Sequence, residues 1–201
     1  LDVKIVCSLL NEDDWIDEMA EPFRSRAWKL IGEEAPNVDA FITPSGYYKD
    51  LFVSNTGFMG KNVHIIPLAL DTRNLNILPK KDNYPAVGYF SRINSSNGFD
   101  KLVDAFIQLK TTNKLPGLTL HVSGGFTGSD KTFIAEQIRK IKSHKLKSFV
   151  RIYPEFHGNS KEEFFSSIDI MSVPVRKHDG YGLYVLEANA SGVPVVEPET
   201  G

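Results

Sequence analysis

The chain has 201 residues and a formal net charge of −2 at pH 7, which is enough length for one large domain or parts of two. Because acidic and basic residues nearly balance, the composition gives no sign of a nucleic-acid surface, and no apolar run is long enough to span a bilayer. Cys7 is the single cysteine, so the chain cannot form an internal disulfide, and a reducing, cytoplasmic compartment is expected.

Strand-like and helix-like segments alternate through the first part of the chain. The order is strand, helix, strand, helix, strand, which is typical of a parallel sheet covered by helices. The predicted elements are a strand at 3–10, an acidic loop at 11–17, a helix that Gly32 closes, a strand at 40–43, a helix that Ser45 caps and a strand at 63–68.

The polar segment 71–85 interrupts this alternation, and its prolines Pro79 and Pro85 predict a domain boundary. We therefore expect a first domain over 1–79, a linker over 80–85 and a second domain over 86–201. The clearest helical stripe of the second domain consists of Phe99, Leu102, Val103, Phe106 and Ile107. The other predicted elements are strands at 86–90, 118–122, 150–153, 168–175 and 193–196, and helices at 133–141, 160–167 and 183–191.

The chain opens on Leu1, without an initiator Met, directly into a strand-like run, and it ends at Gly201 soon after another such run. Both ends are therefore expected to be cuts through a larger protein.

The segment 173–192, VPVRKHDGYGLYVLEANASG, reads as a strand end, a glycine-spaced loop and a helix. Such loops lie at the carboxyl ends of the strands of an α/β sheet, where ligands bind. Asp179 and Glu187 flank the start of the helix, eight residues apart. The predicted apolar face of this helix carries Leu183, Leu186 and Ala190.

The run D-G-Y-G-L-Y-V-L-E-A-N-A-S-G-V-P-V-V, which begins at Asp179, resembles the E-x7-E signature of the family 4 (group 1) retaining glycosyltransferases. The family pattern is E-G-F-G-L-x-x-L-E-A-M-A-x-G-x-P-V-V, and Asp179 stands where the family usually has Glu. The resemblance implies an α/β fold of the GT-B type with two Rossmann-like parallel-sheet domains. Residues 1–79 would then be the tail of the N-terminal, acceptor-side domain, and residues 86–201 most of the C-terminal, donor-binding domain.

The resemblance also implies an activity. Such an enzyme transfers a sugar from a nucleotide diphosphate sugar to an acceptor hydroxyl with retention at the anomeric carbon, and it needs no metal and no cofactor. The donor would be a UDP-, GDP- or ADP-sugar, and the acceptor a carbohydrate or a lipid-linked acceptor in polysaccharide biosynthesis. The fragment alone is expected to be inactive, and peripheral membrane contact would come from regions outside it.

Individual residues inherit roles from the family pattern G-Y-x-G-R-L-x-x-E-K-G. The corresponding run is G-Y-F-S-R-I-N-S-S-N-G at 88–98, in which Arg92 matches the phosphate-binding Arg and Asn97 replaces the Lys. A guanidinium can fork onto phosphate oxygens, whereas an amide brings no charge. The alternative for Arg92 is a solvated surface side chain.

The resemblance places Glu187 on the ribose hydroxyls and Asp179 beside the transferred sugar. The backbone of Gly182, Leu183 and Tyr184 would face the diphosphate at a helix start, where N–H groups and the helix dipole favour an anion. Gly124 would belong to the family's G-x-G turn; a tight loop explains it equally well. A solvated helix Glu and a plain Asp-Gly turn are the structural alternatives for the two carboxylates.

No two of the five histidines have metal-ligand spacing, so no metal site is predicted. Two functional alternatives stay open: a GT-B isomerase that rearranges a nucleotide sugar, and a non-catalytic relative that binds sugar nucleotides, which Asn97 and Asp179 favour. A nicotinamide enzyme is disfavoured because no G-x-G-x-x-G follows a first strand.

Overall fold

The structure is a computed structural model that describes residues 3–10, 12–59, 62–72, 84–153, 160–176 and 181–199. The chain divides into two units: the first extends to Ala69 and includes Tyr181, and the second begins at Leu70 and includes the chain from Gly182 onward. This division falls before the predicted end of the first domain at residue 79, and most of the predicted linker 80–85 lies outside the described residues.

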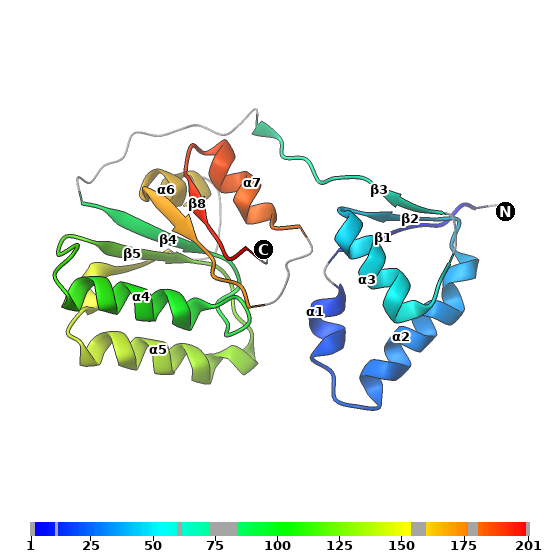
Figure 1. Cartoon of the computed structure of the whole chain (residues 1–201), viewed down its shortest axis with the longest axis horizontal. Helices are drawn as coiled ribbons and strands as arrows, with labels where there is room; N and C mark the ends of the chain where they lie inside the picture. The colour runs from blue at the N-terminus through cyan, green and yellow to red at the C-terminus, as the bar shows by residue number, and fades with distance from the viewer. Residues whose placement is uncertain are drawn as a thin grey trace. The chain divides into compact units, whose positions relative to one another are not determined.

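The first unit is a three-stranded parallel sheet with helices (Figure 1). The strand order is β1-β2-β3, and the register places Val6 opposite Ala40 and Phe41 opposite Val63. Its elements are β1 (Val6–Ser8), α1 (Glu12–Asp17), α2 (Phe23–Glu34), η1 (Ala35–Asn37), β2 (Ala40–Thr43), α3 (Gly46–Thr56) and β3 (Val63–Ile65). Its core consists of Leu9, Ala35, Phe41, Tyr48, Phe52 and Val63.

The acidic stretch that predicts a loop forms the helix α1 instead. Acidic residues favour a helix N-terminus, and three of them lie in the first turn of α1. The backbone N–H of Glu12 donates to the hydroxyl oxygen of Tyr48 at 2.8 Å, and Ile16 is buried beneath the helix. The prediction was wrong because it considered only the charge of this stretch and not the burial of Ile16. By contrast, the cap at Ser45 is confirmed, since its hydroxyl accepts the Tyr48 N–H at 3.1 Å.

Gly32 does not close α2, as its sequence position suggested; it lies inside the helix, which continues to Glu34. A Cβ atom at Gly32 would lie 2.4 Å from the carbonyl oxygen of Thr56, the last residue of α3. The glycine is therefore required for the close approach of α2 to the end of α3.

Replacing Gly32 with alanine is expected to destabilise the first unit, although alanine normally stabilises a helix interior by roughly 0.5–1 kcal/mol over glycine. The added methyl group would force α2 away from the Thr56 backbone, and a loss of about 1–3 kcal/mol in unfolding free energy is expected. Trp15 and Trp28, the chain's two tryptophans, both lie in this unit, so tryptophan fluorescence during urea unfolding measures the effect. Gly46→Ala is the matched control, because its Cβ meets only the Ile65 side chain at 4.0 Å. Equal stability of both variants would show that α2 does not need the glycine.

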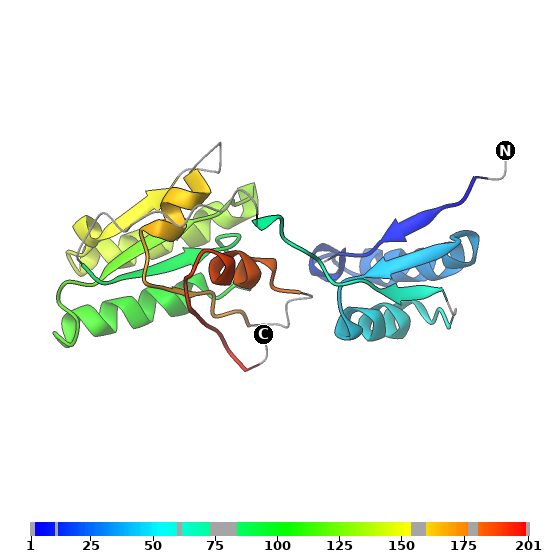
Figure 2. The same cartoon turned by 90° about the horizontal axis from the view of Figure 1, so that it is seen from above.

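The second unit is a five-stranded parallel sheet with helices on both faces (Figures 1 and 2). Its strands are β4 (Ala86–Phe90), β5 (Thr119–Ser123), β6 (Val150–Tyr153), β7 (Ile170–Ser172) and β8 (Val195–Val196). Its helices are α4 (Phe99–Thr111), η3 (Gly128–Asp130), α5 (Lys131–Ser143), η4 (Lys147–Phe149), α6 (Ser160–Ser166) and α7 (Leu183–Ala190). All five residues of the stripe predicted for α4 are buried, which confirms that prediction.

The stripe predicted for α7 is wrong. Tyr184 and Ala188 are buried in the core, whereas Leu183 is 38% exposed. Apolar side chains surround much of this short helix, so the sequence pattern does not define which side faces the sheet. No helix in the described part of the chain is long and apolar enough to cross a membrane.

In the strand order β6-β5-β4-β7-β8, the chain first adds β5 and β6 on one side of β4 and then adds β7 and β8 on the other side. The topological switch point therefore lies between β4 and β7. Figure 1 shows α4 and α5 on one side of this sheet and α6 and α7 on the other. The loops that leave the carboxyl ends of β4 and β7 therefore lead to helices on opposite faces of the sheet; we call the region where these loops leave the sheet the crevice, after the place where open α/β sheets bind ligands. In open α/β sheets, ligands bind at such a switch point. Residues 91–98 and residues 173–176, the described start of the loop after β7, lie here.

Candidate functional site

The loop after β4 and the loop after β7 are in direct backbone contact. Gly98 has a left-handed φ of +69°, and a Cβ atom there would lie 1.8 Å from the carbonyl oxygen of Pro174. No other residue type fits this approach without moving the backbone. The contact fixes the start of the loop after β7 against the start of α4.

Arg176 adds a second connection between these loops. Its backbone N–H donates to the carbonyl oxygen of Ser96 at 2.8 Å. Its guanidinium donates to the carbonyl oxygen of Ser95 at 2.7 Å and to Asp100 Oδ2 at 2.5 Å. Arg176 immediately precedes residues 177–180, so it anchors the chain just before the segment that carries Asp179.

Gly124 connects the loop after β5 to the loop after β4. Its φ is +143°, and a Cβ atom would lie 1.8 Å from the carbonyl oxygen of Ser91. The Ile93 N–H also donates to the carbonyl oxygen of Gly125 at 2.9 Å. The turn at Gly124 and Gly125 thus contacts the chain on either side of Arg92. Position 124 requires glycine because of this close approach.

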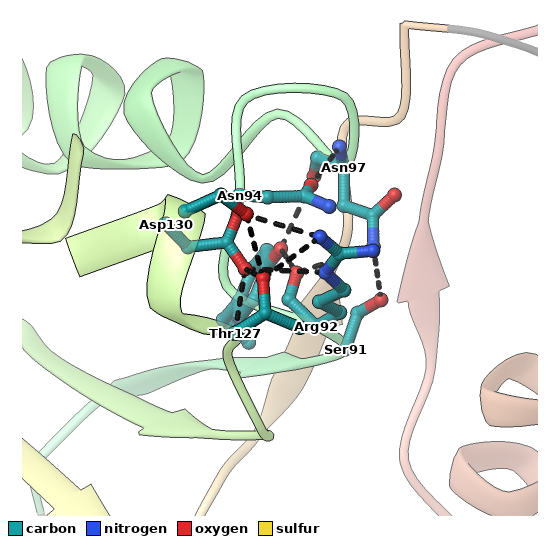
Figure 3. Close-up of polar contacts among 8 residues, drawn as sticks. Ser91, Arg92, Asn94, Asn97, Thr127 and Asp130 are labelled. Atoms are coloured by element: carbon teal, nitrogen blue, oxygen red, sulfur yellow. Dashed lines mark hydrogen bonds and ion pairs between the residues drawn. The ribbon is translucent and has the colours of Figure 1, made fainter. Parts of the chain in front are cut away.

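Asn97 closes the loop after β4 upon itself (Figure 3). Its Nδ2 donates to Ser91 Oγ at 2.8 Å and to the Arg92 carbonyl oxygen at 3.1 Å, and its N–H donates to Asn94 Oδ1 at 2.8 Å. The side chain at the position of the family's Lys therefore holds the loop in shape and presents no charge.

Tyr89 supports the same loop from below. It is fully buried, and its hydroxyl donates to the Arg92 carbonyl oxygen at 2.8 Å. Burial raises the pKa of the Tyr89 phenol; a hydrogen bond with Ser91 opposes this effect and the charge of Asp100 adds to it. The phenol is therefore protonated at neutral pH and donates to the Arg92 carbonyl oxygen.

Arg92 lies between the loop and the turn before α5 (Figure 3). Its Nε donates to Asp130 Oδ2 at 3.2 Å, and its Nη2 donates to Thr127 Oγ1 at 3.2 Å. The Arg92 side chain is 36% exposed, so the guanidinium reaches solvent although one edge is held by a carboxylate. Among the described residues, no acceptor lies within hydrogen-bond distance of Nη1. This oriented amino group is available to a further anion.

Asp130 was missed in the sequence analysis, although the spacing of Thr127 and Asp130 is a capping-box pattern. Asp130 Oδ2 accepts the Thr127 N–H at 2.8 Å and the Thr127 hydroxyl at 2.8 Å, in addition to Arg92. Burial favours a higher pKa for the Asp130 carboxyl. The hydrogen bonds from Thr127 and Arg92 outweigh it, so the pKa falls below its ordinary value of 3.8.

A depressed pKa makes Asp130 a source of stability that depends on pH. The folded state holds the ionised form, so the stabilisation is complete above the ordinary value of 3.8 and is lost as the pH falls through the lower folded pKa. The difference in unfolding free energy between the wild type and Asp130→Asn is expected to be about 1–3 kcal/mol at pH 7. Circular dichroism during urea unfolding should show this difference shrinking below about pH 4. A difference that is constant across this range would contradict a role for the ionised carboxylate.

Glu187 lies in the middle of α7, and its Oε1 forms an ion pair with Nζ of Lys161 from α6. The Glu187 side chain is only 13% exposed, which rules out the alternative of a solvated helix Glu. Lys161 carries no motif and was not predicted. Only the fold brings it to Glu187, because α6 and α7 lie on the same side of the sheet (Figure 1).

The start of α7 has a glycine N-cap. Gly182 has φ +65° and ψ +46°, and no side chain caps the first turn. The helix thus begins at Leu183 with its amino end at the crevice, as the sequence predicted. Asp179 lies outside the described residues, so its predicted role stays a prediction. Among the residues that the structure describes, no three His, Cys, Asp or Glu side chains gather into a metal site.

Three kinds of comparison with known proteins give matches: a family model, curated relatives and solved structures. The family model for Glycosyl transferases group 1 matches residues 71–198. The lipopolysaccharide core biosynthesis mannosyltransferase LpsB of Rhizobium meliloti (strain 1021) is 32% identical over 115 residues, which are 57% of this chain and 31% of that protein. Mannosylfructose-phosphate synthase of Agrobacterium fabrum is 22% identical over 169 residues, 79% of this chain and 37% of that protein.

Among solved structures, Anabaena Alr3699/HepE in complex with UDP and glucose matches 98% of this chain with a TM-score of 0.80 at 17% identity. The match covers 53% of the HepE chain. This likeness confirms the predicted α/β fold with parallel sheets. The chain spans about half of that structure and about a third of the length of the curated relatives it matches.

Proposed function

Because this chain belongs to the group 1 glycosyltransferases, we propose that its second unit binds a nucleotide diphosphate sugar. The whole protein would transfer the sugar to an acceptor hydroxyl, with retention and without a metal ion. The observation that carries the proposal is the convergence at one switch point of a cation with a spare donor, an uncapped helix start and a partly buried carboxylate. These are the groups that the phosphates and the ribose of such a donor require.

Arg92 and the start of α7 would stabilise the diphosphate as it gains negative charge during cleavage of the bond to the sugar. Asp130 fixes one edge of the guanidinium, so Nη1 needs little further ordering before it donates to a phosphate oxygen. The N–H groups at Leu183 and Tyr184 add the positive end of the helix dipole. Preorganised donors of this kind act where the charge develops.

Glu187 would accept hydrogen bonds from the hydroxyls of the ribose, because an ionised carboxylate offers two acceptor oxygens to a diol. Asp179 would lie beside the transferred sugar, where the family has a Glu. Its side chain is one methylene shorter, so its reach differs, and we propose that it tunes the choice of sugar. The names of the relatives favour a hexose donor and a role in surface-polysaccharide synthesis, where the acceptor is a carbohydrate or a lipid-linked sugar.

A second candidate function is sugar-nucleotide binding without turnover. One observation favours it: the Asn97 amide is bonded inside its own loop, so position 97 supplies no cation to the leaving diphosphate. Two measurements on the full-length protein separate the two candidate functions. Titration with a nucleotide sugar measures binding, and the release of free nucleotide in the presence of acceptor extracts measures turnover. Binding without nucleotide release would favour this second candidate.

The proposed function predicts that one of UDP, GDP and ADP binds selectively to the full-length protein. A nucleotide at a hundred times its dissociation constant stabilises the folded state by about 2.7 kcal/mol, which a thermal-shift measurement detects. Glu187→Ala should remove the shift, while Glu33→Ala, a solvated pair partner of Lys29 in the first unit, should retain it. Absence of a shift with any nucleotide or nucleotide sugar in the full-length protein would overturn the proposal.

A further inference from the structure

Lys161 brings a positive charge to the crevice from an element that carries none of the sequence motifs. It lies in the first turn of α6, and its ammonium forms the ion pair with Glu187 Oε1. The same Nζ lies 5.6 Å from the centroid of the Phe90 ring, within the range of a cation–π contact. Phe90 is the last residue of β4 and precedes the loop that carries Arg92. The ammonium therefore lies at the carboxyl end of β4, on the side of the crevice where α7 packs.

The basic side chains described around the crevice are each paired with a carboxylate. The pairs are Arg92 with Asp130, Arg176 with Asp100, and Lys161 with Glu187. Together they carry no net charge, whereas a nucleoside diphosphate brings several negative charges. A bound nucleotide therefore gains charged contacts only from a spare donor or by taking the place of one of these carboxylates.

The three pairs differ in how firmly they are held. Asp130 accepts two further bonds from Thr127, and Arg92 needs no exchange because Nη1 is available. Arg176 is also bonded to the backbone of the neighbouring loop. Within the described part of the chain, the Glu187 carboxylate has no partner other than Lys161. A Lys ammonium sits on a flexible four-carbon stem and can turn to a new acceptor without moving the backbone.

We propose that Lys161 exchanges partners when the nucleotide binds. The ribose hydroxyls would replace the ammonium as donors to Glu187, and the ammonium would turn to a phosphate oxygen. In this exchange neither charge is left unpaired in a partly buried site, which would otherwise be costly. Lys161 would thereby supply, from α6, the cation that is missing at position 97. This inference rests on the proposed function of the same site.

The test compares ligands with and without phosphates in the full-length protein. Lys161→Met should weaken binding of the nucleoside diphosphate that the wild type prefers by about ten- to a hundredfold. Binding of the corresponding nucleoside should stay equal or tighten, because the ribose no longer has to displace the ammonium from Glu187. Lys161→Arg should retain most of the affinity for the diphosphate. Isothermal titration calorimetry measures these three affinities: those of Lys161→Met for the diphosphate and for the nucleoside, and that of Lys161→Arg for the diphosphate.

A matched control is Lys140→Met, which breaks an ion pair with Asp104. Lys140 lies in the last turn of α5, at the end of the helix away from Asp130. The control variant makes the same change of charge and should leave both affinities unchanged. If Lys161→Met weakens nucleoside and diphosphate equally, Lys161 only orients Glu187 and the exchange is overturned. If the variant binds the diphosphate like the wild type, the inference fails while the proposed function stands. If the wild type binds no nucleotide, both fail together.

Discussion

Gly124→Ala is expected to lower the free energy of unfolding of the second unit by about 3 kcal/mol or more. Two costs add at this position. A φ of +143° is a conformation that side chains rarely adopt, and the new Cβ would lie 1.8 Å from the Ser91 carbonyl oxygen. Because the obstructing atom belongs to the backbone, relief requires that the loop after β4 move away from the loop after β5. Circular dichroism during urea unfolding measures the loss.

Gly128→Ala is the matched control for this variant. Gly128 lies in the same connection between β5 and α5, and a Cβ there meets no atom within 4 Å. It should stay within about 0.5 kcal/mol of the wild type. Tryptophan fluorescence should be unchanged in both variants, because Trp15 and Trp28 lie in the first unit. A Gly124→Ala protein as stable as Gly128→Ala would show that the two loops do not depend on their close approach.

Arg92→Met is expected to weaken binding of the preferred nucleoside diphosphate by about ten- to a hundredfold in the full-length protein. The variant removes the spare donor of Nη1, and it also leaves Asp130 without its cation at the edge of the crevice. The uncompensated carboxylate would then repel the diphosphate. Arg92→Lys should recover little, because a single ammonium cannot bond Asp130 and a phosphate with the planar fork of a guanidinium.

The nucleoside without phosphates separates this effect from a general loss of structure. Its affinity should change less than threefold in Arg92→Met, since Glu187 and the ribose contact are untouched. The double variant Arg92→Met/Asp130→Asn removes the repelling carboxylate and should regain part of the diphosphate affinity. Unchanged diphosphate binding in Arg92→Met would make Arg92 a structural residue that acts through its bonds to Asp130 and Thr127.

Much of the fold follows from local sequence patterns. The bounds of β2, β4 and β6 agree with the predicted strands, because short segments rich in β-branched and aromatic residues favour strands. The stripe of α4 was equally clear, since five large apolar residues recur at helical spacing on one face. The family signature then indicated which loops gather at the switch point, and the structure places residues 91–98 and 173–176 of these loops there.

The rest depends on contacts that no local pattern records. Gly32 looked like a helix end, because a glycine inside a helix is normally unfavourable, yet a packed neighbour distant in sequence requires it. Lys161 and Asp130 are ordinary charged residues in the sequence, and only the packing of α6 and of the turn before α5 brings them to Glu187 and Arg92. Asn97 was expected to face a ligand, whereas its donors are used inside the loop.

The pairing of β4 with β7 has a consequence for how the crevice comes into being. Gly88 of β4 pairs with His121 of β5 on one side and with Met171 of β7 on the other. During synthesis β5 and β6 emerge soon after β4, so three strands can assemble early and locally. The partner on the other side is separated from β4 by both of those strands and their helices, and closing so long a loop is slow. The nascent chain therefore has most of its sheet before the switch point exists, and the edge of β4 stays open until β7 arrives.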